Sequence, residues 1–330
     1  MTYVPLAIEG GLLAVHAHPD DETLSTGGLL ATWAAAGLPV TLVTCTRGEQ
    51  GEVIGPDPDR LEGSGDRFGA HRERELAGAL RELDVSDHCF LDQIDGALGA
   101  NEPSPRYRDS GMSWVGEGAA GTSAAAALPS EVPEGAFYFA DLDRAAQSLA
   151  RLISARRPRY VVTYEPGGGY GHPDHVRAYQ LASRAVELIS DDLGYVPQLL
   201  SSVIPSGVMR FGREVLGQRE QFLRDLARDD VAGRGDNGGV EVVIPRPSDP
   251  LAAVSSHDPK ITYVVEVRDV AGKVLRALEA HVTQVQWVAD WRDLPGSSAR
   301  AAGVEVLGAA ALSNGVFFPV FSREYVAALN

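Results

Sequence analysis

An apolar run at Leu12–Val15 is followed closely by the motif His-Pro-Asp-Asp-Glu at His18–Glu22. A short apolar run predicts a buried strand, and open α/β sheets bind their ligands at the carboxyl ends of such strands. A dinucleotide-binding protein carries a glycine-rich phosphate turn at this place. Because this chain carries an imidazole and carboxylates there instead, the motif predicts an α/β metal hydrolase rather than a dehydrogenase.

A second junction between a strand and a helix carries the same residue types. Tyr160–Tyr164 is predicted to be a buried strand, and a glycine-rich loop leads from it to His-Pro-Asp-His at His172–His175, which opens a helix. If the two strands are parallel members of one sheet, their carboxyl ends face the same crevice. Two histidines and one carboxylate, with water in the fourth position, form a common catalytic zinc site. We therefore expect His18, Asp21 and His175 to hold one metal ion.

Taken together and in this order, the two motifs resemble those of the LmbE/PIG-L superfamily of zinc-dependent N-acetylglucosamine deacetylases. The resemblance runs from about Leu12 to His175 and continues weakly toward the C-terminus. Further segments are similar to the branch that serves mycothiol biosynthesis, which implies deacetylation of N-acetylglucosaminyl-inositol to glucosaminyl-inositol and acetate. Those segments are Val43–Thr46, Gly48–Gly55, Arg108–Met112 and Ala311–Asn314.

The resemblance also implies catalytic roles within the two motifs. It makes Asp20 the general base and Asp21 the metal ligand. His172 resembles the family's imidazole that stabilises the oxyanion or protonates the leaving amine, with Asp174 holding its tautomer. Tyr170 resembles the family's mobile tyrosine, whose hydroxyl helps to polarise the carbonyl.

Two residues match family positions that hold the glucosamine and inositol groups, Arg72 and Asp109. Guanidinium and carboxylate groups commonly fix sugar hydroxyls by paired hydrogen bonds. The alternative for Arg72, which lies in an Arg- and Glu-rich segment, is a surface ion pair, and the alternative for Asp109 is a turn cap. Ser25 and Glu52 are weaker candidates for the rim of the site.

Strand-like and helix-like segments alternate through the first half of the chain, which predicts a Rossmann-like, doubly wound, mostly parallel sheet. We expect residues 1–195 to form an LmbE-like metal-binding core. Residues 196–330 are expected to form a smaller C-terminal α/β lobe that completes the substrate cleft. Within that lobe, residues 213–229 have the pattern of one amphipathic helix.

Two long insertions interrupt the alternating pattern, at about residues 93–136 and 232–259. Loops of this length are usually functional rims or disordered segments. In the first insertion, we expect residues 107–112 to form an ordered substrate rim and residues 116–130 to be mobile.

The net charge of −16 argues against nucleic acid and anionic membrane as partners, since both require basic patches. No apolar run approaches the roughly 20 residues of a membrane helix, and the N-terminus lacks the pattern of a signal peptide. We therefore expect a cytoplasmic protein with a small amino-sugar inositol substrate, in an oligomeric state that the sequence leaves open. Two cysteines exclude a structural zinc site built from cysteines alone.

Other acidic and histidine residues are expected to be structural. Glu22 is predicted to support the motif loop through hydrogen bonds rather than to bind metal. Four histidines have no partner at ligand spacing and are each expected to be surface or packed residues: His71, His88, His257 and His281.

Two other functions compete with the deacetylase hypothesis. The related mycothiol S-conjugate amidase typically has a lysine near the position of Ser25 and a proline at the position of Gly171, and this chain has neither. A catalytically silent sugar-binding module would not need a free base beside a metal site. The expected donor set suits Zn²⁺, and it also suits Fe²⁺ or Co²⁺.

Overall fold

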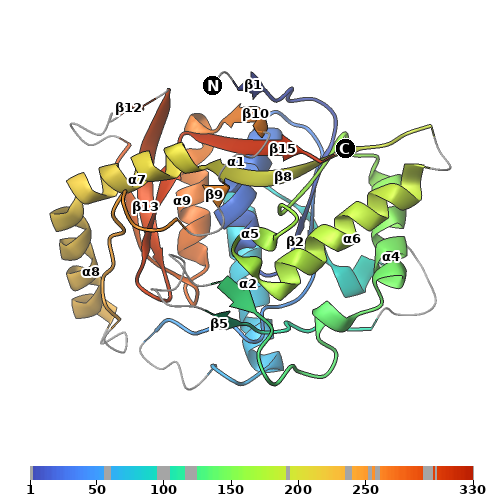
Figure 1. Ribbon diagram of the computed structural model, residues 1–330, viewed down its shortest axis with the longest axis horizontal. Coiled ribbons are helices and arrows are strands. Elements are labelled where there is room, and N and C mark those ends of the chain that lie inside the picture. The colour runs from blue at the N-terminus through green and yellow to red at the C-terminus, as the bar shows by residue number, and fades with distance from the viewer. Residues whose placement is uncertain are drawn as a thin grey trace.

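The computed structural model contains a large sheet covered by helices and a smaller antiparallel sheet (Figure 1). The residues that the structure describes are 3–55, 61–94, 105–115, 125–190, 194–234, 240–251, 255–256, 261–292, 300–301 and 303–329.

The large sheet positions both sequence motifs. Its strands lie in the order β1 (Val4–Pro5), β10 (Ile261–Glu266), β15 (Arg323–Ala328), β8 (Gln198–Pro205), β7 (Tyr160–Thr163), β2 (Leu12–His16), β3 (Val40–Thr44) and β4 (Asp87–Phe90). The strands from β8 to β4 are mutually parallel, whereas β15 is antiparallel to both β8 and β10. The short strand β9 (Ser255–Ser256) also pairs with β8 in parallel. The motif strands β2 and β7 are therefore adjacent and parallel, with Leu12 opposite Tyr160.

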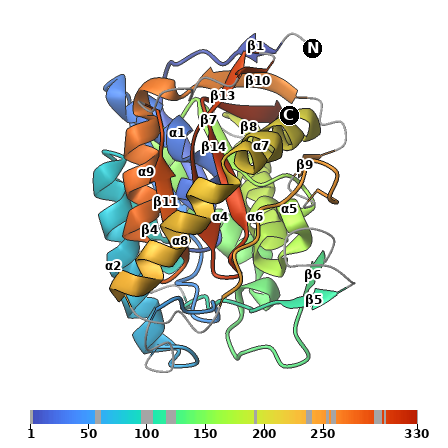
Figure 2. The same ribbon diagram turned by 90° about the vertical axis from the view of Figure 1, so that its left-hand side faces the viewer.

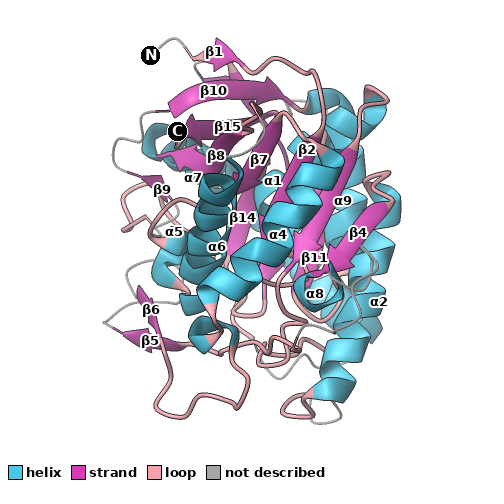
Figure 3. Cartoon of the chain, turned by 90° about the vertical axis from the view of Figure 1, so that its right-hand side faces the viewer, coloured by secondary structure: helices cyan, strands magenta, loops and turns pink. Residues whose placement is uncertain are grey.

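Helices cover both faces of this sheet. One face is covered by α1 (Asp21–Ala35), α2 (Asp66–Glu82) and α9 (Ala271–Ala280), and the other by α4 (Leu142–Arg156) and α6 (Pro173–Ser190). Figure 2 shows α2 and α9 on one side of the molecule, and Figure 3 shows α4 and α6 on the other. This layering confirms the predicted doubly wound, mostly parallel α/β fold.

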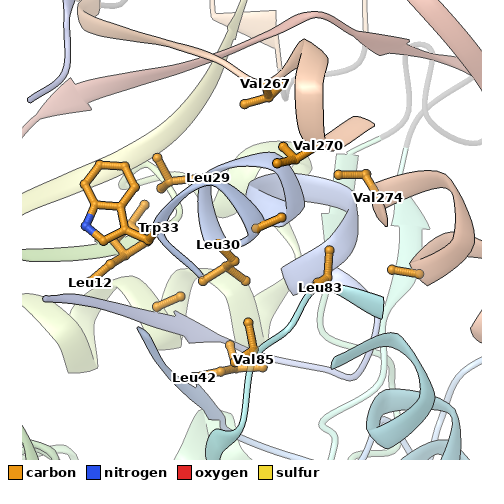
Figure 4. Close-up of a cluster of buried hydrophobic side chains, with 14 of the residues drawn as sticks. Leu12, Leu29, Leu30, Trp33, Leu42, Leu83, Val85, Val267, Val270 and Val274 are labelled. Atoms are coloured by element: carbon orange, nitrogen blue, oxygen red, sulfur yellow. The ribbon is translucent and has the colours of Figure 1, made fainter. Parts of the chain in front are cut away.

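The alternation of side chains along β2 explains the layering. All five residues of the strand are buried, and successive side chains point to opposite faces. Leu12 and Ala14 join the core beneath α1, whereas Leu13 and Val15 join the core beneath α4 and α6. Figure 4 shows Leu12 close to Trp33 of α1. Full burial of a leucine side chain such as Leu12 contributes about 1.5–3 kcal/mol, which helps to anchor the helix whose first turn carries Asp21.

The smaller sheet is antiparallel and lies toward the C-terminus. It contains β11 (Val285–Asp290), β13 (Val304–Leu312), β12 (Arg300–Ala301) and β14 (Phe317–Phe321). Two helices, α7 (Ser206–Gln218) and α8 (Glu220–Arg234), pack on it through a shared apolar cluster. Helix α9 joins the two sheets, since Val274 packs with α1 and Leu275 packs with β11 and β13.

The C-terminal half follows the prediction in part. The smaller C-terminal sheet is present, while β8, β10 and β15, which all follow residue 195, pair within the large sheet. The proposed boundary at residue 195 stays a prediction. The single helix expected over residues 213–229 is wrong, because the helix is interrupted at Arg219, where φ is −112° and ψ is 16°.

The remaining short elements lie outside the two larger sheets, and the two strands among them belong to the first insertion. They are η2 (Leu91–Gln93), β5 (Ser113–Val115), β6 (Ala125–Ala127), η3 (Phe137–Phe139), α5 (Gly168–Gly171) and η4 (Arg268–Val270). The expected substrate rim at residues 107–112 is described and largely buried. Of the segment expected to be mobile, residues 116–124 lie outside the described residues, and residues 125–127 pair with β5. Among the helices that the structure describes, none combines the length and the apolar character of a membrane span.

Candidate active site

The two motifs meet because they leave adjacent parallel strands at the same sheet edge. His18 follows β2, and His175 lies in the first turn of α6, which begins at Pro173 after the loop that leaves β7. The ring centroids of His18 and His175 are 5.3 Å apart. The structure thus brings the two histidines together, as the sheet topology requires.

Asp21 lies between these two imidazoles. Its Oδ2 atom is 3.2 Å from Nδ1 of His18, and its Oδ1 atom is 3.3 Å from Nε2 of His175. The backbone amide of His18 also donates a hydrogen bond to Oδ2 of Asp21, at 2.9 Å. All three side chains are buried. Two nitrogens and a carboxylate therefore converge on one small volume.

The opposite edge of each imidazole is held by an acceptor. Nε2 of His18 is 3.3 Å from Oδ2 of Asp174 and 3.5 Å from Oδ1 of Asp109. Nδ1 of His175 is 3.2 Å from the carbonyl oxygen of Gly168. Metal-binding histidines usually donate their second N–H to a carboxylate or a carbonyl in this way. The inward nitrogens are thus Nδ1 of His18 and Nε2 of His175.

The donor set fits a divalent transition metal. Nε2 of His175 is buried and has no hydrogen-bond partner among the described atoms, which is costly unless something else binds it. The ring nitrogens of His18, His172 and His175 also lie close enough together to bind one ion, within 4.8 Å of one another. Asp21 suits the third ligand position better than His172, because its oxygens face both imidazoles while Nδ1 of His172 accepts the amide of Asp174 at 3.1 Å.

Charge reinforces this arrangement. Burial favours the neutral form of His18, but Asp109, Asp174 and Asp21 outweigh it and hold the pKa of His18 well above its usual value. Burial likewise opposes ionisation of Asp21, yet His175 and His18 hold the pKa of that carboxyl well below its usual value. The cluster therefore holds the carboxylate of Asp21 beside the positive charge of His18. A bound metal cation would take the place of that positive charge.

Asp20 lies beside this cluster at the N-cap of α1. Its Oδ2 atom is 3.3 Å from Nη2 of Arg72. Burial raises the pKa of Asp20 to about 6, although the charge of Arg72 opposes the rise. A carboxyl group with a pKa near the working pH is suited to general base catalysis.

Arg72 is 3% exposed, which excludes the surface ion pair considered as its alternative role. It donates hydrogen bonds to the carbonyl oxygens of Pro19 and Gly48, the latter at 2.9 Å. A side chain at Gly48 would overlap this guanidinium, since an added Cβ atom would lie 1.9 Å from Nη1 of Arg72. The arginine is therefore fixed against both loops beside Asp20.

His172 and Tyr170 border the same volume. The ring of His172 stacks on that of His175 at 4.8 Å and meets that of His18 edge-on at 4.7 Å. Burial, together with the neighbouring imidazoles of His18 and His175, holds the pKa of His172 well below its usual value. The ring of Tyr170 lies 5.1 Å from that of His175.

Asp174 does not hold His172 in the predicted manner. Its backbone amide donates to Nδ1 of His172, which leaves the proton on Nε2. Its carboxylate instead accepts hydrogen bonds from the amide and hydroxyl of Ser110, at 2.9 and 2.5 Å, and faces His18. The expectation that this carboxylate holds the His172 tautomer is therefore wrong, because Ser110 on the rim loop draws the carboxylate away.

Asp109 forms the turn cap that was considered as its alternative role and also faces His18, while its contact with substrate stays a prediction. Its Oδ1 accepts the amide of Gly111 at 2.9 Å, as in an Asx turn, and lies 3.5 Å from His18. Ser25 and Glu52 contribute backbone carbonyls, which accept hydrogen bonds from Ser202 and Gln284 at 2.7 and 2.8 Å. Among the described contacts, neither of their side chains touches the imidazole cluster.

Two residues that sequence reasoning did not assign to the site support it, Tyr164 by direct contact and His281 through Glu22. The ring of Tyr164 stacks on that of His175 at 4.1 Å and 7°. Its hydroxyl accepts the amide of Ala17 at 2.8 Å and hydrogen-bonds to Asp21. His281 is fully buried and hydrogen-bonds to Glu22 at 2.9 Å. No local signal distinguishes either residue, since Tyr164 ends an ordinary apolar strand and His281 lies 259 positions from its partner.

The other isolated histidines stay outside the cluster where they are described. His71 lies 3.4 Å from Glu75, and His88 hydrogen-bonds to Thr44 at 3.1 Å. His257 lies outside the described residues. Glu22 contacts the amide of Asp20, as a loop-supporting residue would.

The fold and site together define an α/β protein with a buried histidine and carboxylate cluster suited to metal-assisted hydrolysis. The family model for PIG-L, the GlcNAc-PI de-N-acetylases, matches residues 13–186, which is more than half of the chain. The chain belongs to this family, and the membership expected from the motifs is confirmed.

Two curated relatives are deacetylases with almost the same name. A 1D-myo-inositol 2-acetamido-2-deoxy-alpha-D-glucopyranoside deacetylase of Streptomyces scabiei is 44% identical over 66% of this chain and 61% of its own length. A similarly named deacetylase of Saccharopolyspora erythraea is 39% identical over 95% of this chain and 88% of its own. A crystal structure of a deacetylase–teicoplanin complex is 18% identical, with a TM-score of 0.48 over 97% of this chain and 99% of the other.

Proposed function

We propose that this chain is a metal-dependent deacetylase that hydrolyses N-acetylglucosaminyl-inositol to glucosaminyl-inositol and acetate in mycothiol biosynthesis. The proposal rests on one observation above all, the placement of the Asp21 carboxylate between two imidazoles with Asp20 beside it. The names of the two curated relatives described above support the choice of substrate.

His18, Asp21 and His175 would hold the metal, which we propose to be one Zn²⁺ per chain, with Fe²⁺ as the alternative. Their donor atoms and buried surroundings suit either ion. When bound, the ion supplies Lewis acidity toward the acetamide carbonyl and toward a water molecule.

Asp20 is assigned as the general base. Its pKa of about 6 leaves it ionised at neutral pH yet basic enough to accept a proton from the attacking water. Arg72 orients the carboxylate through its guanidinium, 3.3 Å away. Because Arg72 is itself held by two backbone carbonyls, the direction of Asp20 is constrained.

His172 is assigned to stabilise the oxyanion or to protonate the leaving amine. Its Nδ1 accepts the Asp174 amide, so its Nε2–H is available as a donor toward developing negative charge. Tyr170, in the glycine-rich loop, is assigned as a second donor, and burial together with Asp21 and Asp20 keeps the pKa of its hydroxyl well above the usual value. Asp174 acts through His18 and Ser110 by positioning both.

Substrate contacts remain proposals that follow the family positions. Arg72 and Asp109 border the cluster and are the leading candidates, while Ser25 and Glu52 are assigned to its rim. Residues 196–330 would complete the cleft, and the backbone contact of Thr283 with Ile54, at 2.9 Å, supports this. A cytoplasmic location stays a prediction.

The test measures amine release, cleavage of a mycothiol conjugate and substrate binding by the purified chain. We expect release of free amine from N-acetylglucosaminyl-inositol, loss of this activity after chelation, and its return with Zn²⁺ or, anaerobically, Fe²⁺. Dominant cleavage of a bimane conjugate of mycothiol would favour the amidase instead. Substrate binding without acetate release, in metal-loaded protein, would favour a binding module.

A further inference from the structure

The backbone at Asp20 is unusual for a residue that has a side chain. Its φ is 109° and its ψ is −32°, in a region that residues other than glycine rarely adopt. Such a conformation persists only where the surrounding structure holds it, and it is often found at functional sites. The conformation directs the chain into α1 while the Asp20 carboxylate faces Arg72.

Glu22 is the residue that holds this turn. Its Oε2 atom accepts the backbone amide of Asp20 at 2.9 Å. Its Oε1 atom accepts the hydroxyl of Thr23 at 2.5 Å and Nε2 of His281 at 2.9 Å. Glu22 and His281 are both fully buried, so each is costly to leave without the other.

His281 comes from the other half of the chain and is itself firmly mounted. It ends α9, and its carbonyl oxygen accepts the amides of Gln284 and Val285 at 2.9 and 2.8 Å. Two residues later, the amide and hydroxyl of Thr283 bind the buried carboxylate of Glu75 on α2, at 2.9 and 2.8 Å. The backbone that carries the imidazole is therefore fixed to α2 and α9, independently of the motif loop.

We propose that His281 and Glu22 form a positioning pair that fixes the backbone of Asp20, and thereby the direction of its carboxylate, for catalysis. The inference rests on the proposed role of Asp20 as general base. Neither residue touches the imidazole cluster among the described contacts. The pair acts through Asp20, and its loss changes turnover rather than metal binding.

The experiment measures kcat, KM and bound metal for metal-loaded variants with acetate release as the assay. In His281→Leu, we expect kcat to fall by about 10- to 100-fold, with KM and metal content unchanged, because a small displacement of a catalytic group has an effect of this size. His281→Gln supplies an amide N–H to Glu22 and should recover most of the turnover. His88→Gln, on the edge strand β4, is the matched control and should keep the kcat of the unaltered chain.

A purely structural role would lower the melting temperature and leave kcat per bound metal unchanged in His281→Leu, and that result would overturn the inference. Equal losses in His281→Leu and His281→Gln would also overturn it, because the hydrogen bond would then not matter. If His281→Leu does not fold, Glu22→Gln decides in its place: reduced kcat supports the pair, and full kcat refutes it. Asp20→Asn separates the two proposals. Full turnover in this variant would refute the role of Asp20 as general base. An inactive Asp20→Asn together with a fully active His281→Leu would refute only the positioning pair.

Discussion

Tyr164→Phe should weaken metal binding without removing a ligand. The hydroxyl of Tyr164 accepts the buried amide of Ala17 at 2.8 Å and hydrogen-bonds to the ligand candidate Asp21. Loss of the hydroxyl leaves the amide unsatisfied, which costs about 1–3 kcal/mol of folding stability. Loss of a hydrogen bond to a metal ligand typically lowers metal affinity by about 10- to 100-fold. The ring that stacks on His175 at 4.1 Å remains, so the site should keep its shape.

The assay is competition for Zn²⁺ against a chelator of known affinity, together with urea unfolding of the metal-free protein. Tyr160→Phe is the matched control, because Tyr160 begins the strand that ends just before Tyr164 and its hydroxyl contacts Arg159 at 3.2 Å, away from the site. We expect Tyr160→Phe to bind metal as the unaltered chain does. Unchanged metal affinity in Tyr164→Phe would refute the reasoning.

Three further predictions concern Asp20, Tyr170 and Glu324. Asp20→Asn should retain its metal and lose about 10²- to 10⁴-fold in kcat, measured by acetate release beside metal analysis, and near-normal turnover would refute its role as base. Tyr170→Phe should lower kcat with unchanged metal content, and identical kinetics would remove the hydroxyl from the mechanism. Burial raises the pKa of Glu324 from 4.5 to about 7, against the opposing amides of Gly28 and Leu29. The folded chain then binds this proton more tightly than the unfolded chain. The contribution of Glu324 to the free energy of unfolding is therefore fully present below about pH 4.5 and falls by about 3 kcal/mol as the pH rises to about 7. Urea unfolding across that range should show the decline, Glu324→Gln should flatten it, and an equal slope in both proteins would contradict the assignment.

The sequence predicts the sheet and the meeting of the motifs because both depend on local patterns. The apolar runs of β2 and β7 mark buried strands, and polar residues directly after parallel strands must share one edge. His18 and His175 could therefore be paired before any coordinates were known. The break between α7 and α8 at Arg219 was not predicted, because the apolar spacing continues through it. The two helices are distinguished only by their packing on the small sheet.

Side-chain partners across the fold could not be read in the same way. The carboxylate of Asp174 turns to Ser110 because the rim loop folds over it, and no spacing within the His172 motif encodes that contact. His281 looks like an isolated histidine in the sequence, and its partner Glu22 is defined only once α9 has packed against α1. Long-range polar contacts of this kind depend on tertiary packing rather than on local periodicity.

We propose that one divalent metal binds between His18, Asp21 and His175. The most direct test is a crystal structure of the metal-loaded protein, with anomalous diffraction measured on both sides of the zinc absorption edge. We expect a single peak at about 2.0–2.2 Å from Nδ1 of His18, a carboxylate oxygen of Asp21 and Nε2 of His175. A metal held by a different set of side chains, or none at this position in active protein, would contradict the account.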